Sequence, residues 1–191
     1  IFGDSLPMYN LEQRMKETNI KGLSIAVIRN YQIDWAKGYG WADIAENRMV
    51  NTETRFQAAS ISKSLNSMGI LKLAEQGRLR LNADINDYLK SWKFPYDSLS
   101  KNKEITTLHL LSHTAALGVH GFPGYNRKDS LPTLIQVLNG NRPANTGAVR
   151  SFGEPGKGFK YSGGGTTITQ QLLMDITGKK YADWMWKNVL K

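Results

Sequence analysis

Ser60 and Lys63 are the residues of this chain whose types and spacing could do chemistry. They lie three positions apart where a helix is predicted to begin, so the hydroxyl and the amine would share one face. A neutral amine at that distance could take the hydroxyl proton and leave the serine as a nucleophile. Serine is also a common helix N-cap. The pair therefore predicts either a nucleophile with its base or an ordinary helix start.

The surroundings of the pair distinguish it from a second copy of the same pattern, and both interpretations of Ser60 stay open at this point. Ser98 and Lys101 repeat the spacing, but they follow Phe94-Pro95-Tyr96 in a polar stretch that is typical of a solvated loop. After Ser60, helical spacing predicts a helix over residues 61–76 that ends at Gly77, a suitable left-handed cap. Its apolar face is expected to hold Ile61, Leu65, Met68 and Leu71.

Composition limits the classes of protein to consider. The chain has 191 residues with 40% hydrophobic content, enough for one domain or two small lobes with a core. It has no cysteine, which excludes disulfides and thiolate metal sites. No apolar run reaches the length that spans a membrane. The net charge of +9 is spread along the sequence, which argues against nucleic-acid binding and remains compatible with an anionic polymer such as a cell wall.

The pattern along the chain changes once, near residue 57. A short amphipathic helix is predicted over residues 11–19, and strands over 22–29 and 32–40 are joined by a tight turn at Asn30-Tyr31. Beyond Ser60 the chain is helical or loop-like, with helices predicted over 61–76, 85–90, 106–112, 131–138, 166–177 and 181–190. Two strands do not form an independently stable sheet. The hairpin therefore requires further strands, and the chain is expected to be incomplete.

Two histidines four residues apart raise the question of a metal site. His109 and His113 would share a helix face, but no third ligand follows at a recognisable spacing, and His120 lies in a glycine-rich stretch. Structural roles are expected instead, with His113-Thr114 ending a helix. Neither a metal nor an organic cofactor is predicted.

A second segment that could take part in chemistry surrounds Tyr161. A Pro155-Gly156 turn, a short extended piece and the glycines 163–165 before a helix would hold Tyr161 at the edge of a rigid loop. Its phenol could pass protons between groups, or it could be an ordinary half-buried tyrosine. No Gly-Lys-Ser/Thr follows the glycines, so a phosphate-binding loop is not indicated.

Four blocks in this order carry a family resemblance: residues 60–63 after the two strands, 77–84, 105–117, and the Pro-Gly turn that leads into Tyr161-Ser162. Together they resemble the serine β-lactamase-like superfamily, and more narrowly the class C β-lactamases, the D-alanyl-D-alanine carboxypeptidases and related esterases. The resemblance implies an α/β (α+β) fold of the β-lactamase/transpeptidase type. Residues 1–57 would supply the N-terminal helix and hairpin of an antiparallel sheet lobe, and residues 58–191 a mostly helical lobe.

The resemblance also implies roles. Ser60 would be the nucleophile, Lys63 its base and Tyr161 the proton relay to the leaving group, while the backbone N–H of Ser60 would supply part of an oxyanion hole. The substrate would be a β-lactam, a D-amino-acid peptide or an ester, handled through an acyl-enzyme. The protein would work in the bacterial envelope, periplasmic or secreted, although no signal segment is visible.

Two departures from the family pattern set further expectations. Gly163 occupies the position where the family often has an asparagine, so this residue could contact substrate only through its backbone. The third motif, Lys/His-x-Gly on a late strand, is absent, so the chain is expected to be the N-terminal portion of a longer protein. It would be inactive or unstable without a C-terminal segment or second chain. The alternative is a catalytically silent homologue that binds peptidoglycan or a protein partner.

Overall fold

The computed structural model describes residues 8–191 and divides the chain into two compact units, Ile1–Gln57 and Ala58–Lys191. Among the described residues, no helix is both long and apolar enough to cross a bilayer.

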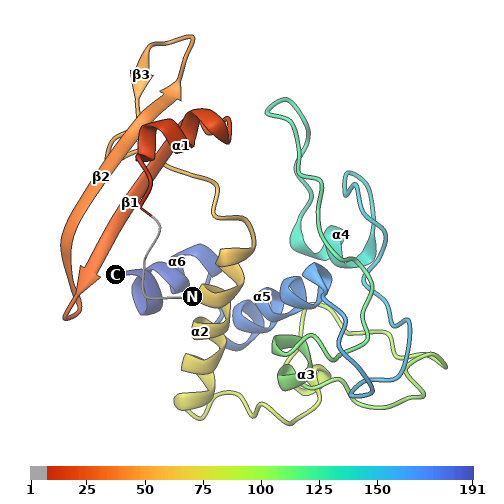
Figure 1. Cartoon of the computed structure of the whole chain (residues 1–191). Helices are drawn as coiled ribbons and strands as arrows, with labels where there is room; N and C mark the ends of the chain where they lie inside the picture. Colours follow the sequence, from red (N-terminus) through yellow and green to blue (C-terminus); the bar gives the residue numbers. More distant parts are fainter. Residues whose placement is uncertain (1–7) are drawn as a thin grey trace. The chain divides into compact units, whose positions relative to one another are not determined.

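The first unit is a helix followed by an antiparallel sheet (Figure 1). Helix α1 (Leu11–Glu17) begins at Asn10, whose side chain accepts a hydrogen bond from the third residue of the helix. Strands β1 (Gly22–Arg29) and β2 (Gln32–Asp43) pair in antiparallel register, which confirms the predicted hairpin. The turn residues Asn30 and Tyr31 have φ values of 50° and 62°, the left-handed conformations that a two-residue hairpin turn requires.

The sheet of this unit contains more than the hairpin. The sequence had indicated that two strands need further strands. A third strand, β3 (Arg48–Met49), pairs with β2 and gives the strand order β1-β2-β3. It is only two residues long, too short for any alternation of apolar and polar side chains to be recognised.

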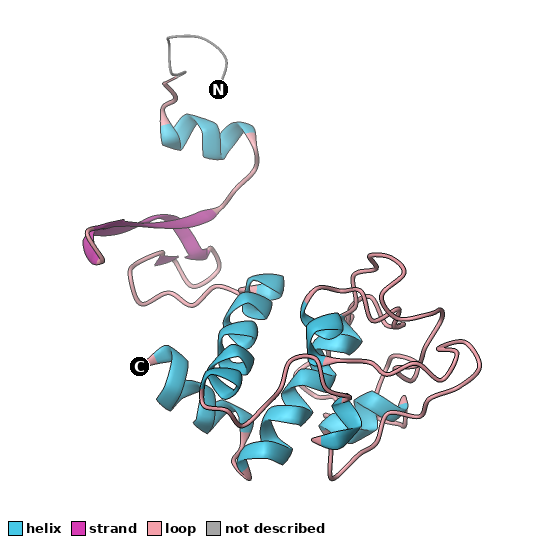
Figure 2. Ribbon diagram, turned by 90° about the horizontal axis from the view of Figure 1, so that it is seen from below, coloured by secondary structure: helices cyan, strands magenta, loops and turns pink. Residues whose placement is uncertain are grey.

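The second unit is helical (Figure 2). A 3-10 turn η1 (Ala59–Ile61) leads into α2 (Ser62–Glu75), and Gly77 follows α2 with a φ of 68°, as predicted for its cap. The remaining elements are η2 (Ile85–Asp87), α3 (Thr107–Leu111), α4 (Leu134–Asn139), α5 (Gly163–Thr177), α6 (Tyr181–Met185) and the π-helical turn η3 (Trp186–Leu190). Helical elements lie in each of the predicted regions. Of the predicted residues 85–90, however, only 85–87 form a 3-10 turn, and residues 181–190 divide into two kinds of helix.

Helix α5 is the centre of this unit. One set of its buried side chains, including Ile168 and Leu172, joins a cluster with residues of α3 and α4. Leu173 joins a second cluster with residues of α2 and α6. Burial of apolar side chains on opposite sides of one helix is the main source of stability that the unit has available. Figures 1 and 2 both show α5 between α2 and the segments that carry α3 and α4.

The predicted apolar face of α2 is wrong. Ile61, Leu65, Met68 and Leu71 are exposed, and the residues that α2 buries are Asn66, Gly69, Ile70 and Leu73. Gly69 is buried because Met185 and Trp184 of the α6 segment lie where a side chain would stand. A glycine and a buried asparagine on the packing face hid the correct periodicity.

Replacing Leu172 of α5 by alanine is expected to lower the free energy of unfolding by about 2–5 kcal/mol, because the side chain is fully buried and its loss leaves a cavity. Urea titration followed by circular dichroism measures the change. Leu131→Ala is the matched control at a leucine that is 72% exposed, with an expected change within about 0.5 kcal/mol. Equal losses in the two variants would contradict the assignment of α5 as the core helix.

Candidate active site

Ser60 lies in a backbone turn under strain immediately before α2. Ala59 has a φ of 44°, a left-handed conformation that is costly for a residue with a Cβ atom. Ser60 is exposed there, and Lys63 follows one turn later inside the helix. The Lys63 Nζ donates a hydrogen bond to the Ser60 Oγ at 3.1 Å. The predicted proximity of the two side chains is confirmed, and their roles stay predictions.

Tyr161 reaches the same hydroxyl from a distant part of the chain. Its phenol donates a hydrogen bond to the Ser60 Oγ at 2.7 Å. The Lys63 Nζ also lies 4.8 Å from the centre of the Tyr161 ring. The pKa of the Tyr161 phenol is lowered from its usual 10.0, mainly by its interaction with the Lys63 side chain and next by the Ser60 hydroxyl. One hydroxyl thus has a lysine and an acidified phenol as its two side-chain partners.

The residue after Tyr161 anchors it to α5. Ser162 is buried, and its Oγ donates to the Gly118 carbonyl at 2.7 Å while accepting from the Gly165 N–H at 3.0 Å. The second contact is an N-cap, so α5 begins at Gly163, three residues earlier than predicted. The Gly163 N–H donates to the His120 carbonyl at 3.0 Å. Side chain and backbone together fix the position at which Tyr161 leaves the loop.

Two imidazoles flank the Tyr161 ring. The His113 ring centre lies 4.5 Å from that of Tyr161 and the His120 ring centre lies 5.0 Å from it. His113 has a φ of 58° just after α3, so it ends the helix region as predicted. Its Nδ1 accepts a hydrogen bond from the Ser162 N–H at 3.3 Å, which requires that nitrogen to carry no proton.

Burial lowers the pKa of His113, and the positive charge of Lys63 lowers it further. Both effects favour the neutral imidazole that the hydrogen bond from Ser162 needs. The sequence did not connect either His113 or His120 with Tyr161. No spacing rule could have done so, because the contacts depend on the packing of α3 and its following loop against the start of α5.

The remaining histidine has a local role. The His109 Nδ1 accepts from the Thr106 N–H at 3.3 Å in the capping box of α3. Within residues 8–191 there is no group of three or more His, Asp or Glu side chains placed to hold a metal ion.

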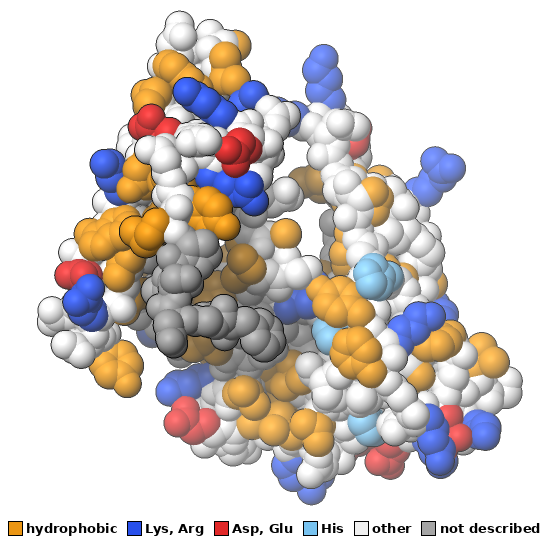
Figure 3. All heavy atoms as spheres, viewed as in Figure 1, with side chains coloured by type: hydrophobic (Ala, Val, Ile, Leu, Met, Phe, Trp, Pro, Cys, Tyr) orange, Lys and Arg blue, Asp and Glu red, His pale blue; other side chains and the backbone are white. Residues whose placement is uncertain are grey.

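The second Ser-x-x-Lys pattern has a different geometry. Ser98 is exposed in a turn, and the Lys101 Nζ pairs with the carboxylate of Glu154 at 3.1 Å. Lys103 donates a hydrogen bond to the same carboxylate. The hydrogen bond from Lys103, and to a smaller extent that from Lys101, lowers the pKa of Glu154 to about 2. Lysine and arginine side chains are otherwise dispersed over the face of the molecule drawn in Figure 3.

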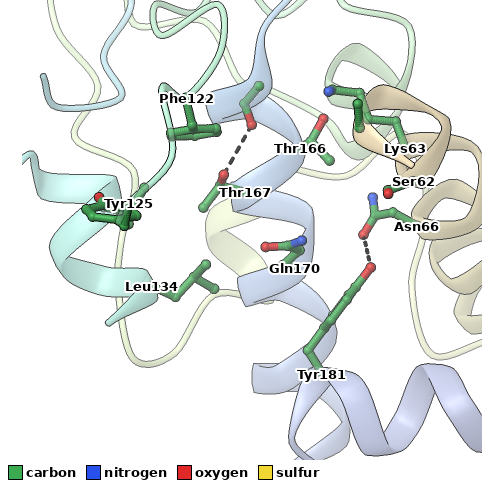
Figure 4. A pocket seen from close by; sticks show the side chains of 13 residues that line it. Ser62, Lys63, Asn66, Phe122, Tyr125, Leu134, Thr166, Thr167, Gln170 and Tyr181 are labelled. Carbon is green, nitrogen blue, oxygen red and sulfur yellow. Dashed lines mark hydrogen bonds between the residues drawn. The ribbon is translucent and has the colours of Figure 1, made fainter. Parts of the chain in front are cut away.

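A pocket of about 400 Å³ opens beside the Ser60–Lys63 pair, within the helical unit. Figure 4 shows Ser62, Lys63 and Asn66 of α2 on one side and Phe122, Tyr125 and Leu134 on the other, with α5 between them. Ala59, Val137, Gly163, Thr166, Thr167, Gln170 and Tyr181 complete its lining. This pocket was not predicted, because its walls come from segments that are far apart in the chain.

Comparisons with known proteins agree with this architecture. A family model described as Beta-lactamase matches residues 10–191. Protein flp of Staphylococcus aureus (strain MRSA252) is 28% identical over 182 residues, which are 95% of this chain and 35% of that protein. The chain thus spans about a third of the length of these curated relatives.

Solved structures show the same fold. The octameric penicillin-binding protein homologue from Pyrococcus abyssi has a TM-score of 0.74 at 24% identity, covering 94% of this chain and 40% of that one. The beta-lactamase/D-alanine carboxypeptidase from Yersinia pestis, complexed with citrate, has a TM-score of 0.73 at 24% identity, covering 93% and 49%. The predicted α/β class and β-lactamase/transpeptidase-like fold are confirmed.

Replacing Ser162 by alanine is expected to lower the free energy of unfolding by about 1–3 kcal/mol, because it removes the N-cap of α5 and leaves a buried N–H and a buried carbonyl without a partner. Chemical denaturation measures the effect. The matched control is Ser98→Ala in an exposed turn, where the change is expected to stay within about 0.5 kcal/mol. A loss no larger than that of the control would show that the cap does not fix the start of α5.

Proposed function

Because the chain belongs to the beta-lactamase family, we propose that it carries the acylation centre of a serine hydrolase, with Ser60 as the nucleophile. One observation carries the proposal: the Ser60 Oγ is bonded both to the Lys63 Nζ at 3.1 Å and to the Tyr161 hydroxyl at 2.7 Å. A serine becomes nucleophilic when a neighbouring group takes its proton, and it needs a second path that returns a proton to the leaving group. Two partners on one hydroxyl meet both needs.

In the proposed reaction the Ser60 Oγ attacks the carbonyl carbon of the substrate as its proton moves to the Lys63 amine, which accepts a proton only in its unprotonated form. The bond between that carbon and the leaving oxygen or nitrogen then breaks. The proton passes from Lys63 through the Tyr161 hydroxyl to the leaving group, and the acyl group stays on Ser60. Water then attacks the ester carbon, one of its protons returns to the Ser60 Oγ, and the acid is released.

The Ser60 N–H is the proposed oxyanion donor from this chain. Among residues 8–191 it donates to no backbone carbonyl outside its own 3-10 turn, which leaves it available to a developing negative charge. One such donor is typically worth about 3 kcal/mol in the transition state. Gly163 remains a proposed substrate-contact residue. Since its N–H is already bonded to His120, the contact would be made by its Cα and by the space beside it.

The proposed substrates are a β-lactam, a D-amino-acid peptide or an ester. The activities named for the Yersinia pestis neighbour favour the first two, and the missing side-chain amide at Gly163 favours the ester. A site in the bacterial envelope, with peptidoglycan as a further possible ligand, is proposed on the same family grounds. The second candidate, a silent homologue that only binds, is favoured by Gly163 alone.

Labelling by a fluorescent fluorophosphonate or a fluorescent penicillin tests the nucleophile. The natural full-length protein is expected to be labelled, and Ser60→Ala is expected to lose the label and at least about 10⁴-fold in kcat, because no other group replaces the attacking oxygen. Ser98→Ala is the control with the same sequence pattern and is expected to keep full labelling. An unlabelled wild-type protein would favour the silent homologue. Loss of the label in Ser98→Ala would assign the nucleophile to Ser98 in place of Ser60.

The pH dependence of kcat/KM tests Tyr161. The relay works in the protonated form, and the pKa of this phenol lies below its usual 10.0, so activity is expected to fall with rising pH before pH 10.0 is reached. Tyr161→Phe should reduce kcat about 10²–10⁴-fold and abolish this alkaline decline. A decline that persists unchanged in Tyr161→Phe would assign it to another group.

A further inference from the structure

We propose that the pocket beside Ser60 binds an apolar acyl group, so that the preferred substrates are carboxylic esters of apolar acids. The inference rests on the proposed acylation of Ser60 and names the part of the substrate that determines specificity.

The position of the pocket decides which half of the substrate enters it. Ala59 and Lys63, which line it, are the immediate sequence and hydrogen-bond neighbours of Ser60. Tyr161, the proposed proton donor to the leaving group, is not part of its lining. The leaving group is therefore expected on the side of Tyr161, and the acyl group in the pocket.

The lining chemistry selects an apolar group. Phe122, Tyr125 and Leu134 lie on one side of the pocket, and Val137 also lines it. Lys63, the hydrogen-bond partner of Ser60, is the one charged side chain among the lining residues. A pocket of about 400 Å³ lies within the usual range for small-molecule sites, whose walls are mostly apolar.

Several polar groups of the lining already have protein partners. The Tyr181 hydroxyl donates to the Asn66 side chain at 2.9 Å, and the Asn66 amide donates to Thr169 at 2.8 Å. The Thr167 hydroxyl donates to the Gly163 carbonyl at 3.1 Å. Figure 4 shows the first and last of these bonds. An acyl group without polar atoms leaves these bonds intact, whereas a polar group would have to compete with them.

Gly163 leaves room for the Phe122 ring in the wall of the pocket. A Cβ atom at this position would lie 3.1 Å from the Phe122 ring and 3.1 Å from the His120 carbonyl oxygen, closer than ordinary contact. The Phe122 ring and a side chain at position 163 therefore compete for the same space. Where the family often has an asparagine amide, this chain has Gly163, and the Phe122 ring takes the space beside it.

The test compares kcat/KM for the p-nitrophenyl esters of acetate and octanoate with the natural full-length protein. Octanoate is expected to be preferred by at least about tenfold, the low end of what a hydrophobic pocket provides for a single added methylene. Leu134→Gln makes the wall polar and is expected to reduce the preference about tenfold or more. Leu131→Gln, at an exposed leucine outside the pocket, is the matched control and should keep the wild-type ratio.

A second variant separates pocket volume from polarity. Val137→Phe keeps the wall apolar but fills the space, so it should lower activity on octanoate while acetate hydrolysis is retained. Fluorophosphonate labelling of each variant confirms that Ser60 still reacts. Wild-type labelling together with an octanoate-to-acetate ratio near one, or equal ratios in Leu134→Gln and Leu131→Gln, would overturn the pocket assignment and leave the hydrolase proposal intact. Absence of labelling in the wild type would overturn both.

Discussion

The burial of helix α5 on opposite sides is the constraint on which the rest of the helical unit depends. Ile168 and Leu172 pack in the cluster with residues of α3 and α4, and Leu173 packs in the cluster with residues of α2 and α6. A helix held in this way cannot shift along its axis without opening a core. Because Tyr161 stands at its start and Ser60 at the start of α2, the packing of α5 against α2 sets the distance between phenol and hydroxyl.

The start of α5 turns this general constraint into a specific geometry. Gly164 comes close to a neighbouring side chain and to neighbouring backbone: a Cβ atom there would lie within 3.1 Å of both the Val149 methyl groups and the Gly118 carbonyl oxygen. Ser162 binds that same carbonyl and caps the helix. The loop after α3 is therefore tied to the helix start by backbone and side chain, and it brings His113 and His120 against the Tyr161 ring. Tight packing, and not a favourable local sequence, orients the phenol.

The sequence predicted the parts of this arrangement that depend on local rules. The hairpin followed from an apolar run, the tight turn at Asn30-Tyr31 and a second strand. The helix after Ser60 followed from spacing, and the contact between Ser60 and Lys63 from the geometry of one helical turn. The apolar face of α2 was wrong, because Asn66 and Gly69 take core positions that apolar residues usually fill. The first turn of α5 was missed because three glycines are read as a loop, whereas a serine cap and close packing make them helical.

The remaining features of the site could not be predicted because they are tertiary. Tyr161 lies 101 positions from Ser60, and only family resemblance joined the two before the structure did. The contacts of His113 and His120 with that ring, and the pocket wall formed by Phe122 and Leu134, combine segments whose order in the chain carries no information on distance. From the resemblance, Gly163 was interpreted as the loss of an asparagine side chain. In the structure the Phe122 ring lies beside Gly163, where a Cβ atom would be 3.1 Å from it.

Peptide mapping by mass spectrometry after reaction with a slowly hydrolysed acyl donor tests the central claim most directly. Trypsin separates the two Ser-x-x-Lys copies, because it releases residues 56–63 with Ser60 and residues 94–101 with Ser98. Fragmentation is expected to place the acyl mass on Ser60 in the first peptide. An adduct on Ser62, an adduct in the second peptide, or only unmodified peptides when the reaction is quenched while the donor is still being turned over would contradict the account.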